Sequence, residues 1–140
     1  MINDDLSLKG KLAIAINGEV VQEVDNLVVT AGKGYVADRM KNNSTIMSHM
    51  AVGTSTSSAA AGNTTLGTEV ARVGLTSTSI SGAVVTYVAS FGAGTGTGAI
   101  TEAGILNASS GGTLLCRTVF SVVNKGSSDA MTITWTVTVS

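Results

Sequence analysis

The chain has 140 residues, of which 44% are hydrophobic and only 12% are charged, and its net charge is −1. This length predicts one domain, and the absence of a Lys/Arg cluster argues against nucleic-acid binding, which depends on neutralising phosphates. Serine and threonine make up about a quarter of the chain, above ordinary usage, so hydroxyl groups rather than charges supply the surface polarity. Such a surface suits a protein that packs against other proteins.

The N-terminal region shows no basic-then-apolar leader, and no run approaches the roughly 18 apolar residues of a membrane span. We therefore expect no membrane contact. The single cysteine, Cys116, cannot form an internal disulfide, which predicts a protein made in a reducing cytoplasm. We expect residues 1–10 to form an arm or an edge strand, followed by one β domain over residues 11–140.

The first elements of the domain are a hairpin and a helix. Asn17 and Gly18 separate two runs of alternating apolar residues, a strong hairpin pattern because both residues tolerate positive φ. Farther on, Thr30 is the expected N-cap of a short helix with apolar residues at helical spacing, despite two glycines inside it. We expect this helix to cover one end of the β structure.

The middle of the chain begins with a predicted buried strand over residues 47–53 and continues into a low-complexity segment over residues 54–68. A loop of this length is uncommon in a compact domain unless it has a function or is ordered by a partner. We regard it as the first candidate for a contact with another subunit. A mobile surface loop without a role is an equally good interpretation.

Further strands are predicted over residues 69–80, 83–91, 99–106, 113–123 and 131–139, with a turn at Ser81-Gly82 and a glycine-rich loop over residues 92–98. The last strand alternates apolar residues with threonines, and the last three strands, joined by short turns, predict an antiparallel meander. In the strand over 113–123 we expect an inward-facing set of alternate residues: Leu114, Cys116, Thr118, Phe120 and Val122. About eight such strands predict an all-β fold, an antiparallel β-sandwich or jelly roll with one short helix.

Glu102 lies in an otherwise apolar strand, where an unpaired buried carboxylate would be costly. Either Arg72 or Arg117 is its natural partner, and we predict a structural ion pair. Catalysis would need a second carboxylate or a nucleophile nearby, and none is indicated. The lone histidine, His49, has no second ligand at metal-binding spacing. We therefore expect no enzymatic activity, no cofactor and no metal.

Three segments of the chain resemble those of a known family. They are AVGTSTSSAAAGNTTLGTE at residues 51–69, ITEAGILN at residues 100–107, and NKGSSDAMTITWT at residues 124–136. They are similar to segments of small tailed-bacteriophage virion proteins, and the likeness covers roughly residues 47–140. The resemblance implies a non-enzymatic, symmetric, virion-bound β domain. In that family such modules occur in capsid decoration (cement) proteins and in tail-fibre or tail-tip proteins.

Among the possibilities that the resemblance leaves, we favour a capsid decoration protein, because here the module forms nearly the whole chain. The implied partners are the chain itself, as a dimer or trimer, and the phage major capsid protein on the capsid exterior. The alternative is a receptor-binding module of a tail fibre or tail tip. The candidate interface residues are in the N-terminal arm and the loop over residues 54–68: Ile2, Leu6, Thr54, Ser55, Thr56, Asn63 and Thr64.

Overall fold

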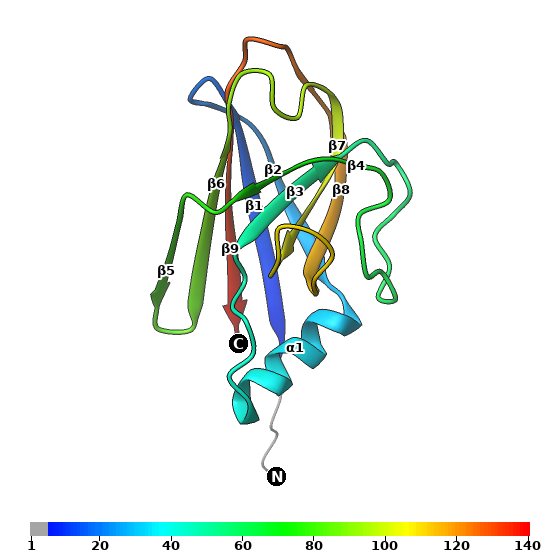
Figure 1. The fold of residues 1–140 in the computed structure, drawn as a ribbon. Helices are drawn as coiled ribbons and strands as arrows, with labels where there is room; N and C mark the ends of the chain where they lie inside the picture. The colour runs from blue at the N-terminus through cyan, green and yellow to red at the C-terminus, as the bar shows by residue number, and fades with distance from the viewer. Residues whose placement is uncertain (1–5) are drawn as a thin grey trace.

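The computed structural model describes residues 6–140, which form one antiparallel sheet of nine strands and one helix (Figure 1). The sheet has the strand order β4-β3-β7-β8-β2-β1-β9-β6-β5. The predicted interface residue Ile2 lies outside the described residues. The elements are β1 (Leu8–Ile16), β2 (Glu19–Val28), α1 (Thr30–Lys41), β3 (His49–Gly53), β4 (Glu69–Gly74), β5 (Ser77–Ser81), β6 (Val84–Phe91), β7 (Gly98–Leu106), β8 (Leu114–Lys125) and β9 (Met131–Val139).

The sheet is curled into a half-barrel, and the path of the chain from β4 to β5 shows that its two edges come close together. Strands β4 and β5 form opposite edges of the sheet, yet only Leu75 and Thr76 separate them in sequence. The Leu75 N–H donates to Ser48 O at 2.9 Å and the Thr76 N–H donates to Val88 O at 2.7 Å. These two bonds link the side of the sheet that contains β3 to the side that contains β6, so the two edges approach each other at this point.

An all-β antiparallel fold with one helix was predicted and is confirmed, whereas the sandwich or jelly roll is not. The sheet does not divide into two because of β2, which pairs with β1 along most of its length and with β8 only at Leu27 and Val28. It thereby joins what would be two sheets into one. The predicted strand over residues 69–80 is also two strands, because the chain crosses from one sheet edge to the other at Leu75 and Thr76.

The predicted hairpin at Asn17-Gly18 is confirmed. Both residues have positive φ, 50° and 84°, as a two-residue turn between twisted strands requires. The Asn17 side chain also fixes the neighbouring turn, because its Nδ2 donates to Asp129 Oδ1 at 3.0 Å and its Oδ1 accepts from the Ala130 N–H at 2.9 Å. The turn before β9 is thus held against the tip of the first hairpin.

Strand β9 has the alternation predicted for it, and its apolar face lies in the centre of the core. Ile133 and Trp135 are fully buried and lie opposite Ile14 and Leu12 of β1. The predicted meander of the last three strands is wrong, however, because β9 pairs with β1 and β6 instead of β8. The N-terminal strand β1 occupies the place beside β9, and a pattern of local turns does not reveal such a long-range neighbour.

Strand β8 does not keep a strict two-residue alternation. Its register against β7 shifts between Ile100 and Glu102 and again between Ile105 and Leu106. The predicted inward positions of Leu114 and Val122 are therefore wrong. Leu114 belongs to a second apolar cluster, and Val122 is 50% exposed. Cys116, Thr118 and Phe120 are buried as predicted, and burial raises the pKa of the Cys116 thiol.

Helix α1 lies at one end of the β structure, as predicted (Figure 1). Its N-cap is Val29, without a side-chain capping bond, so the prediction of Thr30 as the cap is wrong. The Thr30 N–H instead donates to Ala61 O at 2.8 Å, which attaches the start of the helix to the loop over residues 54–68. Within residues 6–140, no helix has the length and apolar character needed to cross a membrane.

The packing of α1 on β8 depends on Gly32, because a Cβ there would collide with the Leu115 carbonyl. We predict that Gly32→Ala lowers the free energy of unfolding by about 1–3 kcal/mol, the usual cost of overpacking. Gly34 is the matched control: it is exposed on the same helix, and a Cβ there meets nothing within 4 Å. Gly34→Ala should stabilise the protein by up to about 1 kcal/mol through helix propensity. Urea unfolding measures the change for both variants. Equal effects on the free energy of unfolding would show that the contact of Gly32 with β8 does not matter for packing.

Candidate functional site

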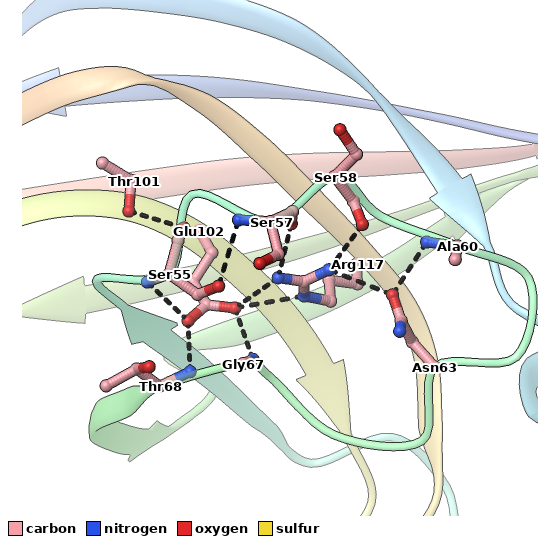
Figure 2. Close-up of polar contacts among 10 residues, drawn as sticks. All are labelled: Ser55, Ser57, Ser58, Ala60, Asn63, Gly67, Thr68, Thr101, Glu102 and Arg117. Carbon is pink, nitrogen blue, oxygen red and sulfur yellow. Dashed lines mark hydrogen bonds and ion pairs between the residues drawn. The ribbon is translucent and has the colours of Figure 1, made fainter.

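The candidate site is a buried ion pair beneath the loop over residues 54–68 (Figure 2). Glu102 on β7 is fully buried, and Arg117 on β8 is 2% exposed. Arg117 Nη2 and Nε lie 3.0 Å and 3.1 Å from Glu102 Oε1. The register that places Arg117 opposite Gly104 brings the two side chains together diagonally across neighbouring strands. Of the two partners left open by the sequence, the structure therefore selects Arg117.

The Glu102 carboxylate also accepts three backbone hydrogen bonds from the loop. Its Oε2 accepts from the N–H groups of Ser55 at 3.0 Å and Thr68 at 2.7 Å, and its Oε1 accepts from the Gly67 N–H at 2.7 Å. Burial opposes ionisation of Glu102, but these N–H groups and the guanidinium outweigh it and hold the pKa of Glu102 below its usual value. The two ends of the loop thus converge on one buried anion.

The guanidinium of Arg117 holds the middle of the same loop. Its Nη2 donates to Ser57 O at 3.0 Å, and its Nη1 donates to Ser58 O at 3.4 Å and to Asn63 Oδ1 at 3.0 Å. Together with the Nε–H bond to Glu102, these bonds engage four of the five N–H donors of an arginine, and Nη2 also forms the ion pair with Glu102. The hollow of about 510 Å³ between the loop and Arg117 therefore contains a guanidinium that is already paired with a carboxylate, which makes it poorly suited to binding a second anion.

A small apolar cluster anchors the loop beside the ion pair. Leu66 is the large apolar side chain of the loop and is 5% exposed. It packs into the second core cluster, on the outer face of the sheet, with Val29, Ala51, Leu106 and Leu114. Gly53 provides room for the ion pair, because a Cβ there would collide with the Glu102 carboxylate and the Thr68 carbonyl. Neither residue was predicted from the sequence, although Leu66 stands out as the one leucine in the serine- and threonine-rich segment.

The predicted interface residues fall into two separate places. In the loop, Thr54, Thr56 and Thr64 are exposed, whereas Ser55 and Asn63 are half-buried because their polar groups bond within the site. Leu6 is 77% exposed and lies beside α1, where it lines a hollow with Val36, Ala37 and Met40. The described candidate residues therefore lie on two separate surfaces, one on the loop and one beside α1.

Arg72, the other arginine considered for Glu102, forms a separate surface ion pair. Its Nη2 lies 2.7 Å from Oε1 of Glu69 on the same strand, and its Nη1 donates to Ala108 O and Gly111 O at 2.9 Å. Arg72 thus fastens the turn after β7 to the sheet edge. This surface pair and the buried pair have similar chemistry but different exposure to water.

Chemically, the buried site is a structural device, since the carboxylate and the guanidinium are paired with each other and hydrogen-bonded to the loop. His49 makes a local contact, with Nδ1 2.7 Å from Ser48 Oγ. Across residues 6–140, no group of three or more His, Cys, Asp or Glu side chains is arranged to hold a metal ion.

Comparisons of the chain with protein-family models, with curated proteins and with solved structures found no match.

Removing the buried carboxylate should be far more costly than removing the exposed one. We predict that Glu102→Gln lowers the free energy of unfolding by about 3–5 kcal/mol, because it leaves the Arg117 charge buried without a counter-ion. Glu69→Gln, the matched control in the surface pair, should cost less than about 1 kcal/mol. Urea unfolding of the three proteins measures the difference, and similar losses for both variants would show that the buried pair does not stabilise the loop.

The buried pair also predicts a dependence of stability on pH. Because the folded-state pKa of Glu102 is lowered, its contribution is present above the unfolded pKa of about 4.3 and is lost as the pH falls through the folded value. The free energy of unfolding of the native protein should therefore fall more steeply below about pH 4 than that of Glu102→Gln. Unfolding curves measured at several pH values test this. A difference between the two proteins that stays constant down to acid pH would refute it.

Proposed function

We propose that this chain is a structural virion protein, a capsid decoration (cement) protein that binds the outer surface of a phage capsid and stabilises it by bridging neighbouring subunits. The resemblance of residues 47–140 to small tailed-bacteriophage virion proteins is the starting point. The feature of the structure that best supports the proposal is the loop over residues 54–68, which is irregular in backbone, exposed at its surface and fixed from beneath by Glu102 and Arg117.

The exposed part of the loop has the chemistry of a neutral contact surface. It presents only small uncharged side chains: Thr54, Thr56, Ser57, Ser58, Ala60, Ala61, Gly62, Thr64 and Thr65. A loop that is already ordered loses little conformational entropy when it binds, so more of its contact energy remains as affinity. Such a surface is suited to lying flat on another folded protein.

We further propose that the half-barrel is a variant of the β-sandwich that the resemblance implies. Its main core contains Leu12 and Trp135 from one half of the sheet and Met50, Ile105 and Cys116 from the other. The two halves therefore enclose a common core, as two packed sheets do. A rigid body of this kind can hold the loop in a constant orientation on the particle surface.

In this role the protein acts by burying surface. Copies associate as dimers or trimers and lie across boundaries between subunits of the major capsid protein, reached by the N-terminal arm and the loop. A standard protein interface buries about 1,600 Å² in total, and many such contacts acting together make dissociation of the shell slow. No chemical step is required.

The alternative, a tail-fibre or tail-tip module, would contact a receptor through the loop over residues 92–98 and the turn over residues 109–112. All five aromatic side chains of the chain are buried or half-buried, which leaves little exposed aromatic surface for stacking on a sugar. Counting copies per particle distinguishes the two locations, because a shell holds many more copies than a tail.

A charge placed on the loop should prevent binding to the capsid. We predict that Thr64→Arg weakens co-sedimentation with undecorated particles by at least about tenfold, equivalent to 1.4 kcal/mol, because it buries an unpaired charge in the contact. Ser127→Arg, on the exposed turn between β8 and β9, is the control and should bind like the native protein. Particles with native protein should also retain DNA to a higher temperature. Native protein that neither binds particles nor changes their heat resistance would refute the proposed function.

A further inference from the structure

The two edge strands of the sheet differ in how they are protected against pairing with other chains. Edge strands usually avoid such pairing through charged side chains, proline or bulges. Strand β4 contains Glu69 and Arg72, and its register against β3 shifts between Val52 and Gly53. Strand β5, with the sequence STSIS, contains no charge, and residues 73–101 around it contain none either. The chain also contains no proline.

Strand β5 is at the same time fully accessible. All five of its residues are exposed, and Ile80 is 74% exposed. Among the described residues β5 pairs with β6 alone, and Figure 1 shows it at the outer margin of the molecule. Alternate N–H and C=O groups of an edge strand point away from its neighbour, so this edge offers hydrogen bonds to another strand.

An apolar groove adjoins this edge. It has a volume of about 470 Å³ and lies between the β5–β6 hairpin and the region around α1; its lining is mostly apolar, with Tyr35, Ile46, Ile80 and Tyr87, and includes one charged residue, Arg39. Ile46 is 58% exposed, so both isoleucines present apolar surface to solvent. A strand added to β5 would extend the sheet next to this groove and could cover part of that apolar surface.

We propose that β5 joins two copies of this chain by pairing antiparallel with β5 of the second copy across a two-fold axis. An identical copy fits because an antiparallel pair of identical strands is self-complementary under two-fold symmetry. It also fits because two uncharged edge strands meet without like-charge repulsion, whereas β5 itself offers no ion pair to a charged partner strand. The pairing joins two nine-stranded sheets into one continuous sheet.

The symmetry of this pairing fixes which residues meet. Ser79 is the central residue of β5, so a centred two-fold register places Ser79 opposite Ser79 of the second copy. Residues directly opposite each other in an antiparallel pair have Cα atoms about 4.5–5.5 Å apart. That spacing falls within the range of about 4.4–6.8 Å that a disulfide bridges. A single cysteine substituted for Ser79 can therefore test the register, because it would form a disulfide with its copy in the second chain.

The first test measures the mass of the free protein. Sedimentation equilibrium of the native chain should show a concentration-dependent dimer. Ile80→Lys should raise its dissociation constant at least about tenfold, because it places two like charges diagonally across the axis, about 7–8 Å apart on the same face of the sheet. Val70→Lys is the matched control on the other edge, where Val70 is 45% exposed, and it should dimerise like the native chain. A native protein that stays monomeric, or equal effects of the two lysines, would overturn the pairing.

The second test does not depend on the lysine variants folding. Ser79→Cys should form a covalent dimer under mild oxidation much faster than Ser57→Cys, a control in the loop over residues 54–68 that is also exposed. The native Cys116 is fully buried and does not compete. Equal rates for the two cysteine variants would contradict the β5 register.

This pairing rests on the self-association that we propose above, but its tests use free protein without capsids. A dimer that fails to bind particles would contradict the decoration role alone. Particle binding by a chain that shows no β5 dimer would contradict the pairing alone.

Discussion

The pairing of Glu102 with Arg117 is the interaction on which the surface of this protein depends. Burying two charges is expensive, and the cost is offset only when the charges are paired and their remaining hydrogen-bonding positions are filled. Here the loop supplies the missing partners, with three N–H groups for the carboxylate and two carbonyls and an amide oxygen for the guanidinium. The ion pair and the loop therefore each require the other to be in place.

This mutual dependence explains how a segment without helix or strand can be well defined. Leu66 anchors the loop in a small apolar cluster, and the contacts with Glu102 and Arg117 anchor it through polar groups. Side chains that point outward are then free to be small and neutral, because they have no part in holding the loop. A stable contact surface with low charge is what a protein that adheres to a larger assembly needs, and this links the buried chemistry to the proposed function.

The curl of the sheet determines where other contacts can form. Because β4 and β5 are consecutive in the chain, the two edges are brought close at Leu75 and Thr76, and each then leads away as an edge strand. One of them is protected by charge and the other is not. A single curled sheet thus offers two different surfaces, a fixed loop over β7 and β8 and an uncharged edge at β5, which could serve contacts with two different partners.

Local patterns in the sequence predicted the local structure well. The Asn17-Gly18 turn, the alternation of β9 and the position of α1 follow from residue preferences over a few positions, and all three are confirmed. The place of β9 between β1 and β6 could not be predicted, because it depends on which distant strand matches its apolar face.

Prediction of the site was limited in the same way, because the site also depends on contacts between distant parts of the chain. Sequence analysis identified Glu102 as a buried carboxylate in need of a partner, yet it could not choose between two arginines. That choice depends on the register of β7 against β8, which includes two irregularities that no local pattern indicates. The role of Gly53 is likewise set by the carboxylate that lies against it in space.

The structure indicates that the buried ion pair fixes the loop over residues 54–68 before the loop binds any partner. Amide hydrogen exchange of the free protein at neutral pH tests this most directly, at the three N–H groups of Ser55, Gly67 and Thr68 that donate to Glu102. We expect these amides to exchange as slowly as those of the central strands, since their release requires the buried pair to open. Exchange at the rate of an unprotected loop would show that the loop is not pre-organised and would contradict the account.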